Sequence, residues 1–246
     1  MEKNYLQQLA ECKTEDELFI LWKSKPIHRT SYIDKKQAID LEINHQKVFI
    51  ADGVVNPEEW EKAPKRVAFI LKEAYRETFD WDLKWKLKHN TLWGTIWPSV
   101  AEWTYGIHNT TKEHIAVYDP ALVSKEANNI WTNQIAVINL KKSSGKSKSS
   151  YAEISAYAKA DKQEIRRQLE IVDPDIIVCG YTFASLNEVY DGKLIKQQKN
   201  WFCFTEEIGG KKRLVIDYYH PANRYPRLLN YYGLVNIYQE ALRSEQ

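Results

Sequence analysis

The chain lacks several features that would place it in a specialised class. It holds only three cysteines, Cys12, Cys179 and Cys203, and no CxxC pair. This spacing excludes a disulfide framework and a cysteine-based zinc site, and it suits a reducing compartment. No run approaches the roughly 18 apolar residues of a membrane-spanning helix, and the first residues lack the apolar stretch of a secretory signal. We therefore expect a cytoplasmic protein outside the membrane.

Charge is nearly balanced, while aromatic residues are abundant. The 246 residues carry 35 basic and 33 acidic side chains, so the net charge is +2. The hydrophobic share of 43% is that of a globular chain, and the length is that of one large domain. Five of the nine tryptophans fall in one window: Trp81, Trp85, Trp93, Trp97 and Trp103.

The first 60 residues have helical patterns. Thr14 and Glu17 form a capping box before an apolar run, and Asn56-Pro57 is typical of a helix start. Between them, the pattern over 33–51 predicts a second helix. We therefore expect residues 1–60 to form an N-terminal helical extension.

Four short apolar runs follow, as expected for strands covered on both faces: 66–71, 135–140, 175–180 and 213–219. Helical patterns separate them, clearest at 161–172, 181–190 and 225–243, and 201–204 is a candidate fifth strand. Strands that alternate with helices predict parallel pairing. The predicted fold is a three-layer α/β/α sandwich with a central, mainly parallel four-stranded sheet. It occupies residues 61–246 and carries a Trp-rich insertion at 80–110.

Polar residues follow the predicted strands. Glu73 comes after the first, Asn139 ends the second, and His220 follows the last. A loop rich in lysine and serine, 141–150, also follows the second strand. Ligands of open α/β sheets bind beyond the carboxyl ends of the strands. We therefore expect these groups to converge at one edge of the sheet.

These motifs resemble those of the uracil-DNA glycosylase superfamily. One branch has Gly-Glu-Ala-Pro-Gly after the first strand, an asparagine ending the second, and His-Pro-Ser after the last. The segments KEAYR (72–76), VINLKK (137–142), IIVCG (176–180) and YYHPANR (218–224) are similar in order and spacing. The likeness covers about residues 66–243 and leaves out the N-terminal segment and the Trp-rich window.

The resemblance implies a DNA glycosylase, an enzyme that hydrolyses the N-glycosidic bond of a flipped base. Glu73 would position water and balance the oxocarbenium ion, as carboxylates do in glycoside hydrolysis. His220 would stabilise the departing base through its carbonyl oxygen. Asn139 would read the base edge. No cofactor and no metal are implied. Each residue also has a structural alternative, since Glu73 can satisfy free amides, Asn139 can cap a turn and His220 can bond to backbone.

The departures from the family pattern fall around the base pocket. Lys72 replaces a glycine, Tyr75 stands where proline is expected, and Ala222 replaces the serine of His-Pro-Ser. The altered wall predicts a base other than uracil, and the resemblance extends to antiviral glycosylases that remove glucosylated hydroxymethylcytosine from phage DNA. Repair of uracil is the alternative. The expected pocket residues are Ala74, Tyr75, Arg76, Trp81 and Trp85, although the tryptophan spacing also fits buried helix faces.

Two basic segments suggest contact with DNA phosphates. The expected DNA-binding residues are Lys141, Lys142, Ser143, Ser144, Lys146, Asn223, Arg224 and Tyr225. Arg224 and Tyr225 fall where relatives insert a wedge into the duplex. A solvated loop is the alternative for 141–150. We expect a monomer that acts on single- or double-stranded DNA.

Two other classes compete with the enzyme. Gly145-Lys146-Ser147 resembles the end of a phosphate-binding loop, but Leu140 stands where that loop needs its first glycine. A non-catalytic DNA-binding module is the second competitor.

Overall fold

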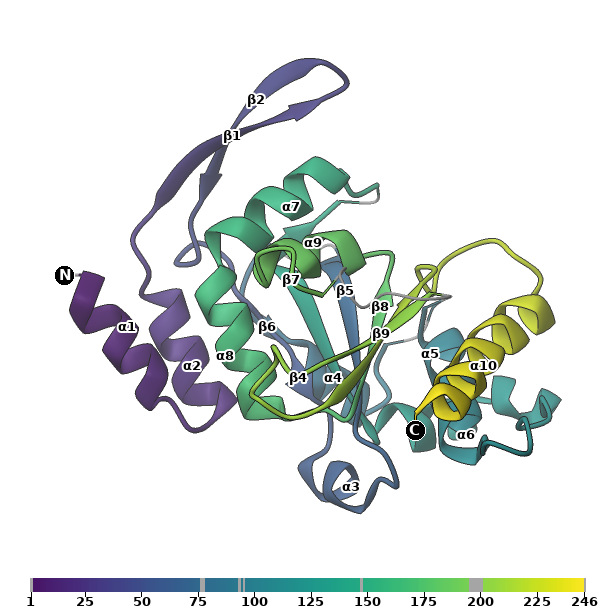
Figure 1. The fold of residues 1–246 in the computed structure, drawn as a ribbon. Coiled ribbons are helices and arrows are strands. Elements are labelled where there is room, and N and C mark those ends of the chain that lie inside the picture. The colour runs from purple at the N-terminus through teal and green to yellow at the C-terminus, as the bar shows by residue number, and fades with distance from the viewer. Residues whose placement is uncertain are drawn as a thin grey trace.

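A six-stranded sheet lies at the centre of the protein (Figure 1). The structure is a computed structural model that describes residues 2–75, 78–92, 94, 96–146, 148–194 and 201–245. In order across the sheet, the strands are β4 (Gly53–Val54), β7 (Ile135–Gly145), β5 (Val67–Tyr75), β8 (Ile176–Gly180), β10 (Arg213–Tyr218) and β9 (Phe202–Thr205). The four inner strands are parallel, and both edge strands run antiparallel to their neighbours. The fold is therefore α/β with a mixed sheet.

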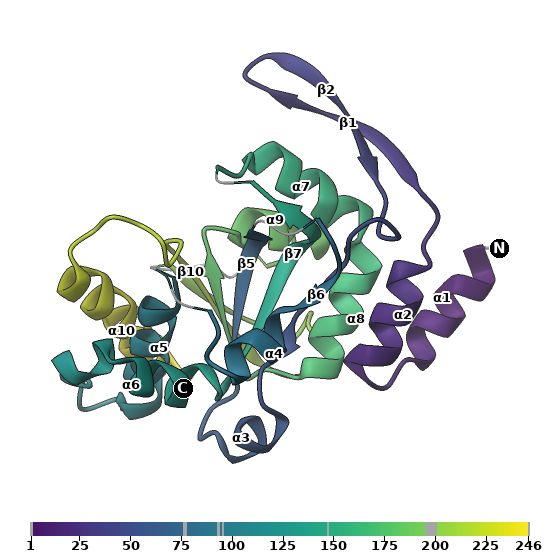
Figure 2. The same ribbon diagram turned by 180° about the vertical axis from the view of Figure 1, so that it is seen from behind.

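Helices cover both faces of this sheet (Figure 2). One group packs in a first hydrophobic cluster: α1 (Glu2–Glu11), α2 (Glu15–Lys23), α7 (Tyr151–Ala160), α8 (Lys162–Val172) and α9 (Phe183–Val189). The opposite side carries α4 (Leu83–Lys88), α5 (Ile96–Asn109), the short η1 (Pro120–Val123), α6 (Lys125–Thr132) and α10 (Arg227–Ser244). In the part of the chain that the structure describes, none of these helices combines the length and apolarity needed to cross a membrane.

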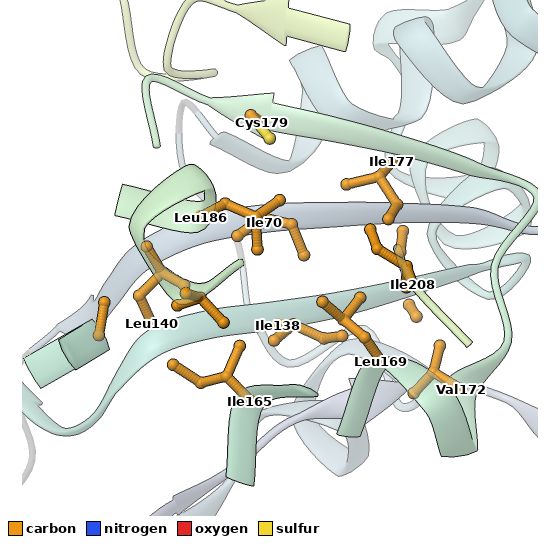
Figure 3. Close-up of a cluster of buried hydrophobic side chains, with 14 of the residues drawn as sticks. Ile70, Ile138, Leu140, Ile165, Leu169, Val172, Ile177, Cys179, Leu186 and Ile208 are labelled. Carbon is orange, nitrogen blue, oxygen red and sulfur yellow. The ribbon is translucent and has the colours of Figure 1, made fainter. Parts of the chain in front are cut away.

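Alternation along the strands explains why both faces are covered. In β5, Ala68 and Ile70 are buried on the side of α8, while Phe69 is buried against the other cluster. Figure 3 shows Ile138 beside Ile165 of α8, with Ile70 on the neighbouring strand. Strands that are apolar on both faces need helices on both.

Most sequence-predicted elements are confirmed. All four apolar runs are strands, residues 202–205 form β9, and α8 ends at Val172 as predicted. Thr14 caps α2 through a complete capping box, and α3 (Pro57–Lys62) begins at its proline. Two antiparallel edge strands make the sheet six-stranded and mixed, which corrects the expected four-stranded sheet.

The predicted helix over 33–51 is wrong. This segment instead holds the turn and second strand of a hairpin of β1 (His28–Asp34) and β2 (Gln37–Ile43). It also holds the short β3 (Ile50–Ala51), which pairs with β6 (Trp81–Asp82). Burial alternates along β1, which is the period of a strand. The turn places Lys35 and Lys36 at positive φ, as a two-residue hairpin turn requires. The hairpin projects past α7, on the side where the parallel strands end (Figure 1).

The Trp-rich window lies mainly in α4 and α5. Trp103 is fully buried, stacked on Phe69, and Trp81 and Trp97 are partly buried against the same cluster. Trp85 is 54% exposed and stacks on His89. Trp93 lies outside the described residues. Core packing therefore accounts for Trp103 and for much of Trp81 and Trp97.

Candidate active site

The strand connections place a switch point between β5 and β8. The chain leaves β5 along the face of α4 and α5 to reach β7, then crosses the opposite face through α7 and α8 to reach β8. Ligands of open α/β sheets bind where the strand order reverses in this way, at the carboxyl ends. Lys72 and Glu73 of β5 and Tyr181, directly after β8, stand at this point.

Glu73 is held by an internal ion pair. Its Oε2 lies 2.8 Å from the ammonium of Lys141, and only 4% of its side chain is exposed. The backbone N–H of Lys146 donates to its Oε1 at 3.3 Å. A Cβ added to Gly145 would fall within 2.9 Å of Glu73 side-chain carbons. Only glycine therefore allows the end of β7 to approach this carboxylate so closely.

Lys141 joins Glu73 to the helix α7. Its ammonium also lies 2.7 Å from Oε1 of Glu153. Burial acts to lower the pKa of Lys141, but the hydrogen bonds to Glu153 and Glu73 and the charges of these carboxylates together raise it. The lysine is therefore protonated and fixes the position of both carboxylates.

His220 is a neutral hydrogen-bond donor. Its Nδ1 accepts the backbone N–H of Ala222 at 3.2 Å, so the neutral ring carries its proton on Nε2. Burial, and then the positive charge of Lys72, lower the pKa of His220 to about 4. Asn223 braces the turn, since its side-chain amide donates to the His220 carbonyl at 2.9 Å. At neutral pH this histidine can donate a hydrogen bond without carrying a charge.

Lys72 interacts electrostatically with both Glu73 and His220. Burial lowers the pKa of its amine, whereas the charge of Glu73 acts to raise it. Its Nζ lies 4.8 Å from the centre of the Tyr181 ring, and Tyr151 meets that ring edge-on at 6.3 Å. The sequence marks Lys72 only as a departure from the family pattern and places Tyr181 directly after a predicted strand, but it gives no signal for Tyr151. The positive φ of Tyr181 is not visible in the sequence.

Asn139 does not face a ligand with its amide. Its backbone N–H and its Nδ2 both donate to Oδ2 of Asp52, at 2.8 and 3.1 Å, and it is 2% exposed. Asp52 also accepts from Lys142 and Gln168. Asn139 is therefore enclosed by the protein, and one of the two Nδ2 hydrogens that base reading would use is engaged by Asp52.

The expected lysine- and serine-rich loop is largely strand. Lys141 and Lys142 are buried, at 3% and 0% exposure, because β7 continues to Gly145 and both ammonium groups pair with carboxylates. The expectation that these two lysines contact DNA is therefore corrected. Ser143 is half-buried and donates to the Tyr157 hydroxyl, at 3.1 Å. The strand also leaves no room for a phosphate-binding loop there.

The remaining expected residues are dispersed. Ser144 is half-buried, Lys146 is exposed beside Glu153, and Arg224 is exposed. Ala74 packs partly against the core, while Tyr75 is 44% exposed at the end of β5. Arg76 lies outside the described residues.

The tryptophans expected to line a pocket have other surroundings. The ammonium of Lys86 lies 4.3 Å from the Trp81 ring centre, and Trp85 of α4 stacks on His89, which caps the end of that helix. Rings beside the switch point come instead from Tyr151 and Tyr181. Among the residues that the structure describes, no three His, Cys, Asp or Glu side chains gather as metal ligands would.

Comparison with models of known protein families finds no match for this chain. Comparison with curated proteins likewise finds no relative. The geometry of the site therefore carries the functional argument.

Proposed function

We propose that this chain is a DNA glycosylase, which hydrolyses the N-glycosidic bond of a flipped modified pyrimidine and leaves an abasic site. One observation carries the proposal. A fixed carboxylate, Glu73, and an uncharged donor, His220, occupy the same edge of the sheet and both interact electrostatically with Lys72. The motif resemblance to the uracil-DNA glycosylase superfamily supports the same function.

The two groups match the charges that develop in the reaction. As the bond breaks, positive charge grows on the sugar and negative charge on the base. Glu73 is suited to position water and to stabilise the oxocarbenium ion. The Nε2–H of His220 is suited to the base oxygen, since a preorganised donor stabilises developing negative charge in a water-poor site. No step needs a cofactor.

We propose that Lys141 acts as a positioning residue. It holds Glu73 at 2.8 Å and is itself anchored by Glu153. Asn139 is left out of the proposed catalytic set, because it is 2% exposed and its Nδ2 donates to the buried Asp52. The base must leave the duplex stack to reach this edge, as in other enzymes that act on bases.

The proposed substrate is a bulky modified cytosine, such as glucosylated hydroxymethylcytosine of phage DNA, in antiviral defence. Lys72 and Tyr181 support this choice, because Lys72 stands where the family pattern has a glycine and its ammonium lies 4.8 Å from the centre of the Tyr181 ring. Aromatic faces pack well on the apolar faces of sugars, and amines hydrogen-bond to their hydroxyls. We further propose a cytoplasmic monomer built as a three-layer α/β/α sandwich, with Lys146 and Arg224 contacting phosphates.

The deciding experiment measures abasic-site formation on duplexes that contain uracil, hydroxymethylcytosine or its glucosylated form. Release of the glucosylated base by the native chain, and its loss in Glu73→Gln, is the expected result. Efficient release of uracil alone would favour the repair enzyme instead. DNA binding without release of any base would favour a non-catalytic module.

A further inference from the structure

An aromatic pocket opens beside the His220 turn. It encloses about 300 Å³, at the lower end of the range for small-molecule sites. Its lining includes Trp201, Tyr219, Tyr225, Leu229 and Asn230. Tyr219 directly precedes His220, and Tyr225 lies in the loop that leads from the turn to α10. The pocket is therefore a neighbour of the proposed active site but consists of different residues.

The rings of this pocket face solvent. Tyr219 and Tyr225 lie 4.9 Å apart between centres, and Trp201 lies 6.0 Å from Tyr219. Trp201 is 52% exposed and Tyr225 is 51% exposed. Clustered exposed aromatics commonly mark a binding surface.

The backbone at Trp201 is also strained. Its φ is +72°, a conformation that costs a residue with a side chain of order 1 kcal/mol or more. A hydrogen bond from Asp217 N–H to the Trp201 carbonyl, at 2.8 Å, holds it there. Packing does not bury the indole, so folding alone gives little reason for a tryptophan at this position.

The polar groups of the pocket suit a nucleotide. Asn230 Oδ1 accepts from Asn223 at 3.0 Å, whereas its Nδ2 donor has no partner in the described part of the chain. No lining residue is acidic. Arg224, next to Tyr225, is exposed, and the described residues provide it with no ion pair. Rings for stacking, an amide donor and a cation together match a base and its phosphate.

We propose that this pocket binds an unpaired nucleobase of single-stranded DNA, stacked on Trp201 and Tyr225 with its phosphate near Arg224. The role as a second base site beside the flipped nucleotide rests on the proposed glycosylase function. Binding of the base to the pocket does not depend on that function. Because the base must be unpaired, we also expect a preference for single-stranded or locally opened DNA over a closed duplex.

The test compares binding of a short fluorescein-labelled oligothymidylate and of a duplex of equal length, by fluorescence anisotropy. Tyr225→Ala and Trp201→Gly should weaken single-strand binding roughly 5- to 150-fold each, the range for loss of one base–aromatic stack. Trp201→Gly should not lower the thermal unfolding temperature, because glycine accepts the positive φ without strain. Ile130→Ala, a 56% exposed apolar truncation on α6, is the control and should bind normally.

The outcomes separate the two proposals. No binding of the oligonucleotide by the native chain, or equal binding by Trp201→Gly and Tyr225→Ala, would overturn the pocket assignment. Normal base release in those variants would then leave the glycosylase proposal standing. Conversely, weakened binding in the two variants, together with no base release by the native chain, would support the pocket and overturn the enzyme.

Discussion

The ammonium of Lys141 lies 2.8 Å from a carboxylate oxygen of Glu73, and both side chains are almost fully buried. The same ammonium reaches Glu153 on α7. Glu153 in turn accepts a hydrogen bond from Tyr32 of the projecting hairpin, at 3.4 Å. The proposed catalytic carboxylate therefore belongs to a network that ties the end of β5 to α7 and to the hairpin.

Glu73→Gln should reduce abasic-site formation by about 100-fold or more, because an amide cannot act as a general base or balance the oxocarbenium charge. The fold should persist, since glutamine keeps the shape of the side chain. Glu153→Gln is the matched control, as it removes the other carboxylate from the same lysine and should reduce the rate less. Equal rates for native chain and Glu73→Gln on the preferred substrate would refute the assigned role.

Lys141→Met should lower the free energy of unfolding by about 3–5 kcal/mol, the usual result of removing one partner from a buried ion pair. Two carboxylates would then lie close together without a cation. Denaturant unfolding of the variant measures this loss. A stable Lys141→Met protein that loses only DNA affinity would instead support the surface role first expected from the sequence.

Protonation of His220 should not reduce the reaction rate near pH 6.5, the ordinary pKa of histidine. Its pKa in the folded protein is about 4, so the ring stays neutral and able to donate as the pH falls from 7 to about 5. Lys72→Met removes the positive charge that contributes to this low pKa, although burial, the larger cause, remains. A pH–rate profile should therefore show an acid limb at higher pH in Lys72→Met than in the native chain.

The lowered pKa of His220 also makes the stability of the folded protein depend on pH. Between pH 4 and the ordinary value of 6.5, the unfolded chain binds a proton at His220 that the folded chain does not. The contribution of His220 is thus fully present above pH 6.5 and is lost as the pH falls toward 4. His220→Gln should flatten the stability profile in this window. An unchanged profile would contradict the low pKa.

The sequence predicted the apolar framework well because its signals are local. The helical pattern at 161–172 predicted α8, which buries Ile165, Leu169 and Val172 on one side, and continuous apolar runs predicted the inner strands. Lys141 and Lys142 were wrongly predicted to lie in a surface loop, because the carboxylates that pair with them are far away in the sequence. Asp52 is 90 residues from Lys142, and Glu73 is 68 from Lys141. Nothing local in a run of lysines and serines distinguishes a buried ion pair from a solvated loop.

The site was predictable only in part, for the same reason. Glu73 and His220 follow apolar runs, so their place at the strand ends could be anticipated. The Nδ1 contact of His220 with Ala222, which fixes the proton on Nε2, depends on a turn geometry that only the structure shows. The burial of Asn139 against Asp52 depends on the edge strand β4, which has only two residues.

Lys142 and Lys146 should behave in opposite ways. Lys142→Met leaves the buried Asp52 without its cation and should cost about 3–5 kcal/mol of stability. Lys146 has a side chain that is 65% exposed, so Lys146→Gln should hardly change stability. If Lys146 contacts a phosphate, its loss should reduce the slope of log affinity against log salt by about 1. Thermal unfolding and salt-dependent anisotropy measure the two effects, and a reversed pattern would restore Lys142 as a DNA contact.

The hairpin turn should become more stable when its two central lysines are replaced by asparagine and glycine. Lys35 and Lys36 adopt φ values of +48° and +68°, where side chains are disfavoured. Asn-Gly is the preferred pair for such a turn, so Lys35→Asn combined with Lys36→Gly should relieve strain of order 1 kcal/mol. Amide hydrogen exchange in β1 and β2 should slow accordingly. Lys36→Ala is the control, because it removes a charge but keeps the strain, and it should leave exchange rates near those of the native chain. Faster exchange in the Asn-Gly variant would mean that the lysines stabilise the turn through contacts that outweigh the backbone strain.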